Sequence, residues 1–183
     1  MPTIPPQDDS SRTRSLLGFG ILAGPFYLAL SIGQGLVREG FDFGRHSLSM
    51  LANGAGGWIQ TANFLLTGAM VVAAAVGLRR ALAPAGRGMT WMLIGYGICI
   101  LAAAIFPADP MDGFPVGTPA GFPTTISSVG MLHFGFGALG FTLLGVACLF
   151  AWRTAALRSI ATLSLVAGLL VLIGFYGGMA APS

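Results

Sequence analysis

Charged residues are scarce in this chain of 183 residues, and their scarcity excludes an ordinary soluble domain. They make up 8% of the sequence, against about 25% in soluble domains, whereas 55% of the residues are hydrophobic. A soluble domain of this length could not cover its surface with so few charges. Lipid must therefore be the solvent for much of the chain, and membrane lipid is the first partner that the composition predicts.

Several motifs of metal and nucleophilic chemistry are also missing. Cys99 and Cys148 each lie deep within an apolar stretch, with no CxxC pair and no neighbouring histidine. This pattern is typical of small buried side chains and indicates neither a disulfide nor a zinc knuckle. The sequence contains no HExxH zinc motif and no GxSxG nucleophile motif. Any metal or catalytic site would have to be assembled from residues that lie far apart in the sequence.

What the sequence does contain is long apolar runs. A hydrocarbon core of about 30 Å needs roughly 20 residues of helix, and five segments approach or exceed that length. They cover residues 15–37, 58–78, 89–106, 128–152 and 160–179. We predict an all-α integral membrane bundle of five transmembrane helices that forms one domain over residues 15–179. The first run is longer than the apolar part of a signal peptide and is expected to stay as a helix.

The flanking segments are expected to be tails. Residues 1–14 are polar and contain proline, which predicts a disordered cytoplasmic tail, and residues 180–183 would form a short extracytoplasmic tail. This assignment rests on the arginines, because cytoplasmic loops of membrane proteins carry an excess of basic residues. With the N-terminus inside the cell, seven of the nine arginines fall on the cytoplasmic side; they are Arg12, Arg14, Arg79, Arg80, Arg87, Arg153 and Arg158. Basic residues scattered singly at helix ends do not form a nucleic-acid-binding stripe, so no nucleic acid is expected as a partner.

Two longer loops, residues 38–57 and 107–127, remain for the extracytoplasmic side, and we expect them to fold as a cap over the helix ends. In the first loop, Asp42 is expected to cap a short helical segment and to pair with Arg45. In the second loop, Asp109 lies close to the end of an apolar run. A carboxylate there needs a partner, for which Arg45 or a protonated histidine would serve.

His133 is the most informative single residue, because it lies about five residues inside the fourth apolar run. An ionisable side chain at that depth is a functional-site candidate, although a neutral histidine bonded across helices also explains it. With His46 and Asp109 it could form a zinc site with an open position, a proton relay or an acid–base pair. The candidate catalytic or metal-binding residues are His133, His46 and Asp109. The candidate substrate-binding residues are Arg45, Ser49 and Asp112.

The order of several strings resembles the DUF998 family of bacterial and archaeal membrane proteins. The resemblance is carried by GFDFGRHSLSMLANGAGGWIQTANFLLTGAM, then GLRRAL, FPADPMDGFPVGTP, TTIS and GMLHFGFGALGF. It implies the membrane fold and singles out a set of positions rather than an activity. These positions are Arg45, His46, Ser49, Asp109, Pro110, Asp112 and His133. Family members usually carry a sixth helix after this point, so the chain is expected to be a short variant or a truncated one.

We expect the chain to lie in the bacterial inner membrane, and three functional hypotheses follow. The first is an outward-facing His/Asp/Arg site that binds or hydrolyses a lipid or another amphipathic small molecule, with Arg45 on an anionic headgroup. The second is a non-catalytic transport component or assembly partner in which the same residues only hold the loops to the bundle. The third is haem held between the two histidines, which predicts visible absorbance. The sequence does not determine the oligomeric state.

Overall fold

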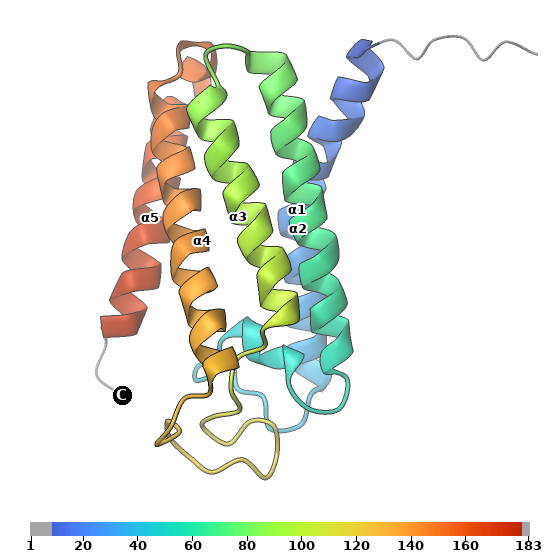
Figure 1. Cartoon of the computed structure of the whole chain (residues 1–183), viewed down its shortest axis with the longest axis vertical. Helices are drawn as coiled ribbons and strands as arrows, with labels where there is room; N and C mark the ends of the chain where they lie inside the picture. Colours follow the sequence, from blue (N-terminus) through green and yellow to red (C-terminus); the bar gives the residue numbers. More distant parts are fainter. Residues whose placement is uncertain (1–8, 181–183) are drawn as a thin grey trace, which may run out of the picture.

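The computed structural model describes residues 9–180, and its regular structure is helical throughout (Figure 1). The long helices are α1 (Asp9–Val37), α2 (Gly57–Leu82), α3 (Arg87–Ile105), α4 (Ser128–Arg153) and α5 (Ala161–Ala180). Two short 3-10 helices lie in the connections, η1 (Leu48–Ala52) and η2 (Ala155–Ile160). No β-strand occurs between residues 9 and 180, so the all-α fold class is confirmed.

Five helices are long and apolar enough to cross a membrane, which confirms the number of spanning segments predicted. Large apolar side chains such as Ile21, Leu163 and Ile173 lie exposed on the outside of these helices. In water such a surface would be unfavourable, but in a bilayer it faces acyl chains of the same polarity. The chain is therefore built as a multi-pass membrane protein.

The helices extend beyond the apolar runs from which they were predicted. α1 begins at Asp9, so residues 9–14 are helical where a disordered tail was expected. Residues 1–8 and 181–183, for which tails were also predicted, lie outside the described residues. α2 continues through Arg79 and Arg80 to Leu82, because arginine favours helix and its long side chain can reach the headgroup region while its stem stays in the apolar layer.

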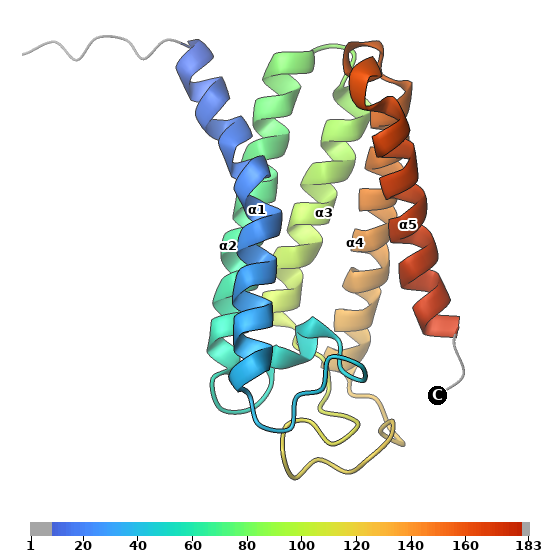
Figure 2. The same ribbon diagram turned by 180° about the vertical axis from the view of Figure 1, so that it is seen from behind.

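Each helix packs mainly against its neighbours in sequence, α1 on α2, α2 on α3, α3 on α4 and α4 on α5. Figures 1 and 2 show the resulting row, with α1 and α5 at opposite sides and the first turns of α1 leaning away from α2. Between residues 9 and 180, no extensive contact joins α1 to α5. The helices thus form an open row rather than a closed ring.

Glycines allow the closest approach between these helices. A β-carbon on Gly97 of α3 would lie 3.0 Å from the carbonyl oxygen of Gly68 on α2 and 2.7 Å from the side chain of Val72. A similar contact joins Gly168 of α5 to the carbonyl oxygen of Gly145 on α4, again at 3.0 Å. Small residues that bring backbones together are the main source of packing energy between helices in lipid.

A buried polar cluster joins α1 to α2 within the membrane-spanning region. The Asn63 side-chain amide donates to the Tyr27 carbonyl oxygen at 3.1 Å and to the Ser31 hydroxyl at 3.1 Å. Ser31 in turn donates to the Gln60 side chain, and Thr67 donates to the side-chain oxygen of Asn63. Hydrogen bonds between neighbouring helices at this depth stabilise their pairing by roughly 0.6–2 kcal/mol each. Asn63 of α2 therefore bonds directly to α1.

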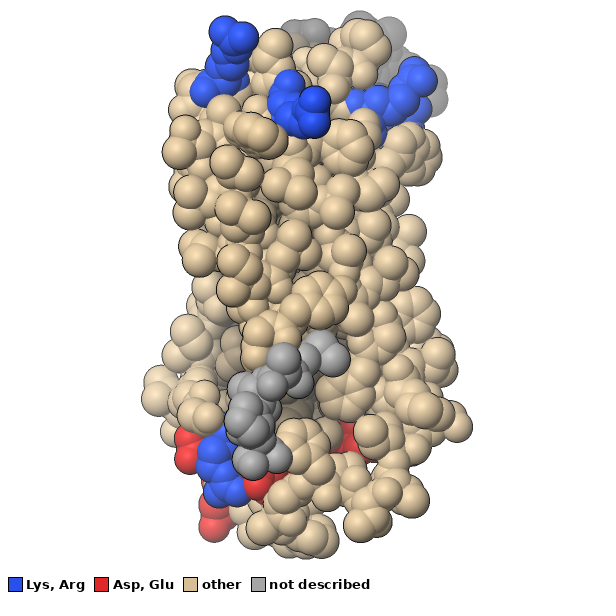
Figure 3. All heavy atoms as spheres, turned by 90° about the vertical axis from the view of Figure 1, so that its left-hand side faces the viewer, with Lys and Arg blue, Asp and Glu red and all other residues tan. Residues whose placement is uncertain are grey.

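Charged side chains lie at the two ends of the bundle, with an uncharged surface between them (Figure 3). One end, called here the arginine end, includes the start of α1, the end of α2 and the start of α3. Its arginines are Arg12, Arg14, Arg79, Arg80, Arg87, Arg153 and Arg158. At the opposite end the two longer loops fold over the helices. We call residues 38–56 and 106–127 together the cap.

Candidate functional site

The cap has a small hydrophobic core of its own. Phe114 and Leu51 have no exposed surface, and they pack with Met50 and Met111, with Phe41 alongside. η1 supplies Met50 and Leu51, whereas the second loop supplies Met111 and Phe114. The two loops therefore bury apolar side chains against each other. This burial holds the loops together independently of their polar contacts.

The cap is also tied to the end of α1 by polar side chains. Arg38 donates to the carbonyl oxygens of Leu51 and Asn53, at 3.2 and 2.6 Å, and its guanidinium lies 5.2 Å from the centre of the Phe114 ring. Gln34 donates to the Leu51 carbonyl oxygen at 3.2 Å. Sequence analysis did not single out Gln34 or Arg38. A polar residue in the last turn of an apolar helix, or directly after it, is the signal that could have identified them.

Asp112 is the residue on which the two loops meet. Arg45 holds its carboxylate through two hydrogen bonds, from Nε to Oδ2 at 3.0 Å and from the terminal nitrogen to Oδ1, across 67 residues of sequence. The Gly121 amide donates to the same carboxylate at 3.1 Å. Asp112 adopts a left-handed backbone conformation, with φ of 53°, which aspartate tolerates better than most residues. We call Arg45, His46, Asp112 and Gly121 the Asp112 clamp.

The charge pair shifts the ionisation of both partners. The Arg45 guanidinium, together with the Gly121 amide, holds the pKa of the Asp112 carboxyl below its usual value. The pairing with Asp112 in turn raises the pKa of Arg45. Both side chains are partly exposed, so water and salt screen the interaction. The clamp is thus a positioning device for the loops rather than a strongly stabilising buried ion pair.

His46 completes the clamp by binding the main chain of Asp112. Its Nδ1 accepts a hydrogen bond from the Asp42 amide at 2.9 Å, which requires the proton to be on Nε2. Nε2 then donates to the Asp112 carbonyl oxygen at 2.9 Å. Both ring nitrogens of this buried histidine are therefore taken up by the protein itself, and neither is left for a metal ion or haem in this arrangement.

The expected pairing of Arg45 with Asp42 or with Asp109 is wrong. The Asp42 carboxylate instead accepts a hydrogen bond from the amide of Gly44 at 2.7 Å, two residues further on. This local turn satisfies Asp42 without Arg45. The positions of the loops bring Asp112 rather than Asp109 to Arg45. Ser49 lies in η1, and its hydroxyl lies 3.1 Å from that of Ser47.

Asp109 organises the start of α4. Its carboxylate accepts hydrogen bonds from the Ser127 amide at 2.7 Å and from the Ser127 hydroxyl at 2.6 Å. The Ser127 hydroxyl also accepts from the amide of Gly130, at 3.0 Å, and so caps the helix. A negative charge beside the first turn of a helix is favourable. Asp109 therefore has a structural partner, and it is neither an arginine nor a histidine.

His133 is held differently from the other predicted residues. It lies on α4, largely buried, and its Nδ1 is 2.7 Å from the carbonyl oxygen of Phe106, just beyond the end of α3. A carbonyl only accepts, so Nδ1 carries the proton and Nε2 carries a lone pair. Within residues 9–178, Nε2 has no hydrogen-bond partner, and it is not a fully enclosed atom. Of the two histidines, both of which lie within residues 9–178, only His133 thus keeps a ring nitrogen lone pair that no described protein atom uses.

The predicted residues accordingly fall into separate places. The structure brings Arg45, His46 and Asp112 together, places Asp109 at the start of α4 and holds His133 on the end of α3. Among the described residues, no three histidine, cysteine, aspartate or glutamate side chains come close enough to hold a metal ion. The zinc site therefore remains a prediction for metal analysis to test.

Comparison with known proteins gives the family and no closer relative. No curated protein and no solved structure matches this chain. The family described as "Protein of unknown function (DUF998)" matches residues 21–183, which include the cap and all the candidate site residues. The resemblance seen in the cap strings and in the fourth apolar run is thereby confirmed. The chain belongs to the DUF998 family.

Proposed function

We propose that this chain binds a lipid or another amphipathic small molecule beneath the cap, and that His133 contacts this ligand. The observation that carries the proposal is the lone pair on His133 Nε2, which no described protein atom uses. His133 lies about 8 Å along α4 from the start of that helix. At that depth water is scarce, so a hydroxyl, amide or headgroup donor of an amphipathic molecule is a suitable partner for the imidazole.

The proposal includes an orientation of the protein in the membrane. The arginine end would face the cytoplasm, because basic residues are retained on that side of the inner membrane, and the cap would then lie outside the cell. A ligand bound beneath the cap would come from the outer leaflet or from the space beyond it. Its polar part would contact His133 while its apolar part stays in the acyl-chain layer.

We favour binding over hydrolysis because no carboxylate or nucleophile among the described residues is hydrogen-bonded to His133. A general base for hydrolysis is normally oriented by a carboxylate or placed next to a nucleophile. Here a main-chain carbonyl orients the ring, and the nearest candidate carboxylate in sequence, Asp109, is bound to Ser127.

A second candidate is a non-catalytic transport component or assembly partner in which these contacts serve structure alone. The Asp112 clamp favours it, because Arg45, His46 and Asp112 satisfy one another without a ligand. Under this reading the cap would be a fixed part of the fold that presents its outer surface to another protein.

Lipid retention distinguishes the two. Wild type, His133→Ala and the matched control Leu139→Ala would be purified in mild detergent and analysed for bound lipid by native mass spectrometry. Leu139 lies six residues further along α4 and is 50% exposed, so its loss changes the lipid-facing surface and keeps the imidazole. We expect wild type and Leu139→Ala to retain a lipid or amphipathic molecule that His133→Ala loses.

Equal retention by all three proteins would reject the proposed role of His133 and favour the second candidate. Zinc content measured on the same samples tests the metal prediction, because a zinc ligand at His133 would make His133→Ala lose the ion. Incubation with fluorescent ester and amide lipids tests hydrolysis. Turnover by wild type that His133→Ala abolishes would show that the site is catalytic after all.

A further inference from the structure

Two glutamines lie on neighbouring turns of α1 and α2 beneath the cap, and each keeps one side-chain atom without a partner. Gln34 is 5% exposed and Gln60 has no exposed surface. Among the described residues, neither Oε1 of Gln34 nor Nε2 of Gln60 makes a hydrogen bond, although both atoms are buried. One of these atoms is an acceptor and the other is a donor. Buried polar atoms are nearly always hydrogen-bonded, so two unpaired ones so close together indicate a binding site.

The contacts of each amide determine which of its atoms is left over. Nε2 of Gln34 lies 3.2 Å from the Leu51 carbonyl oxygen and 3.1 Å from that of Gly56. Carbonyl oxygens only accept, so turning this amide over would place oxygens against each other. Oε1 of Gln60 accepts from the Asn63 amide at 3.3 Å, and a bond to a main-chain carbonyl fixes that amide as a donor. Turning the Gln60 amide over would therefore oppose two nitrogens.

The two unpaired atoms belong to successive levels of one helix pair. Ser31 of α1 bonds to Gln60 of α2, and one turn nearer the cap Gln34 bonds to the carbonyl oxygen of Gly56, just before α2. α1 runs towards the cap and α2 runs away from it (Figure 2). The step between the two levels is three residues on α1 and four on α2, or about 4.5 and 6 Å. One water molecule with two hydrogen bonds of about 2.8 Å each spans such a separation.

The chemistry of the two atoms selects the ligand. A metal cation needs several free oxygen atoms, whereas the Gln60 oxygen already accepts two hydrogen bonds and the Gln60 nitrogen would repel a cation. An anion would be repelled by the Gln34 oxygen. Water both donates and accepts, and it is small enough to lie between two packed helices. Water therefore fits this pair of atoms, and neither kind of ion does.

We infer that a water molecule is bound between Gln34 and Gln60, accepting a hydrogen bond from the Gln60 nitrogen and donating one to the Gln34 oxygen. Gln34 bonds to the cap through the carbonyl oxygen of Leu51, and Gln60 belongs to the polar cluster that extends to Thr67. The water thus links the cap to the polar cluster within the spanning region. This inference involves neither His133 nor the side of the membrane on which the cap lies.

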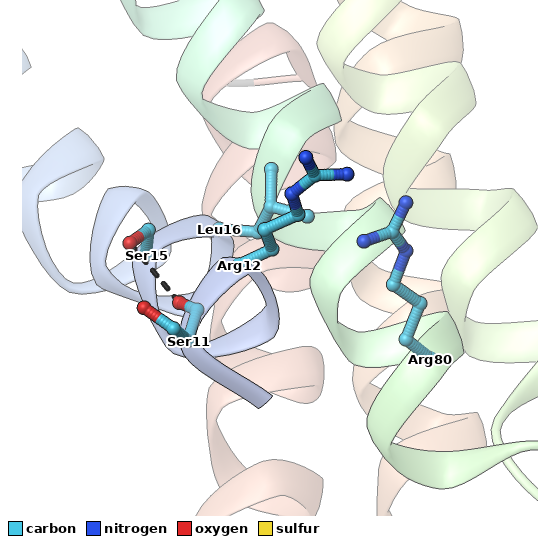
Figure 4. Close-up of a pocket in the computed structure, with 5 residues that line it drawn as sticks. All are labelled: Ser11, Arg12, Ser15, Leu16 and Arg80. Carbon is cyan, nitrogen blue, oxygen red and sulfur yellow. Dashed lines mark hydrogen bonds between the residues drawn. The ribbon is translucent and has the colours of Figure 1, made fainter. Parts of the chain in front are cut away.

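The opposite end of the same helix pair differs in its exposure. Figure 4 shows the side chains that line a pocket there, which are Ser11, Arg12, Ser15, Leu16 and Arg80. All of them except Leu16 are exposed, so their polar atoms can be reached from outside the protein. The two glutamine amides beneath the cap are buried, and a ligand for them has to be held within the structure.

The hydroxyl of Tyr27 is the competing partner for the Gln60 nitrogen. It lies close to Ser31 and Gln60, yet it makes no hydrogen bond with that nitrogen. A small rotation of the two side chains into bonding geometry would satisfy Gln60 without water and would leave the Gln34 oxygen unpaired. The experiment must therefore distinguish a water contact from a bond to Tyr27.

Nuclear magnetic resonance of the detergent-solubilised full chain makes this distinction. The chain contains three glutamines, Gln7, Gln34 and Gln60, so selective ¹⁵N labelling of glutamine side chains leaves few signals to assign. Cross-peaks would be sought between water and the Gln60 side-chain amide protons. In the rotating frame, a bound water and proton exchange give cross-peaks of opposite sign. We expect the cross-peak of a bound water in wild type, and its absence beside a resolved Gln60 signal would overturn the site whatever the variants do.

Three variants locate the water. Gln34→Met keeps the length of the side chain and removes the acceptor, so the water cross-peak to Gln60 should be lost. Thr67→Val is the matched control, because it removes a hydroxyl deeper in the same cluster and should leave the cross-peak in place. Tyr27→Phe should also retain it. A cross-peak that survives in Gln34→Met, or that is lost in Tyr27→Phe or Thr67→Val, would overturn the bridge between the two glutamines.

Discussion

His46 donates a hydrogen bond to the main-chain carbonyl of Asp112 at 2.9 Å, across 66 residues of sequence. The neighbouring residue, Arg45, binds the carboxylate of the same aspartate. Two consecutive residues of the first loop thus hold the main chain and the side chain of one residue in the second loop. The ionic and the main-chain halves of this clamp can be removed separately.

Asp112→Asn tests the ionic half. Asparagine tolerates the left-handed conformation and keeps an acceptor for the Gly121 amide, but it loses the charge that Arg45 binds. We expect several-fold faster amide hydrogen exchange in residues 38–56 and 107–127, and a larger increase in Asp112→Ala. Asp42→Asn is the control, because among the described residues the Asp42 carboxylate accepts a hydrogen bond from the nearby Gly44 amide alone. Unchanged exchange in Asp112→Ala would contradict a role for the clamp.

Acidification should loosen the cap through the same residue. The hydrogen bond from Arg45, and then that from the Gly121 amide, lowers the pKa of Asp112 in the folded protein. The unfolded carboxyl titrates near pH 4, so the stabilisation is complete above about pH 4 and is lost as the pH falls through the lower folded pKa. In wild type, the rate of hydrogen exchange of residues 107–127, corrected for its intrinsic pH dependence, should rise as the pH falls below about 4. Asp112→Asn should lack that step.

Phe114→Ala should destabilise the cap more than any single polar change. Phe114 is fully buried between the two loops, and removal of such a ring costs about 3–5 kcal/mol. We expect limited proteolysis to cut within residues 107–127 while the five helices remain protected. Phe122→Ala, at a position in the same loop that is 70% exposed, is the matched control. Equal protease resistance of both variants would show that the cap is held by something other than this core.

Gly97→Ala should weaken the packing of α3 on α2. The new methyl group would meet Val72 at 2.7 Å and the Gly68 carbonyl oxygen at 3.0 Å, so the helices would have to move apart. The expected loss is about 1–3 kcal/mol, as for other overpacked positions. It would be measured by unfolding in mixed detergent micelles. Gly135→Ala on α4, where a methyl group meets nothing within 4 Å, should leave the stability within about 0.5 kcal/mol of wild type or raise it slightly.

The fold could be predicted from the sequence because its signals are long and local. Apolar runs of about 20 residues have few alternatives to a spanning helix. The ends of the helices were less predictable, since residues 9–14 and Arg79–Leu82 are polar or mixed in sequence yet continue α1 and α2. Hydropathy marks where the lipid layer ends, whereas the helix continues for as long as its own hydrogen bonds are satisfied.

The partners within the candidate site could not be predicted in the same way. The choice of Asp112 over Asp109 as the partner of Arg45 depends on how the second loop turns, including the positive φ angles at Gly113, Gly117 and Gly121. The partner of His133 is a main-chain carbonyl, a group that every residue possesses and that no sequence pattern singles out. The depth of His133 in the fourth apolar run could be predicted from the sequence, whereas its hydrogen bond to the Phe106 carbonyl oxygen could not.

The packing of each helix on its sequence neighbours has a consequence for how the protein is made. During synthesis each spanning segment enters the membrane after the one on which it packs, so its main contact surface is already present when it arrives. Assembly can then proceed pair by pair in the order of translation, with little waiting for distant segments. The cap is the exception, because its two loops are separated by α2 and α3. It can close only after α3 has crossed the bilayer and the second loop has followed it, which makes cap closure a late step of biogenesis.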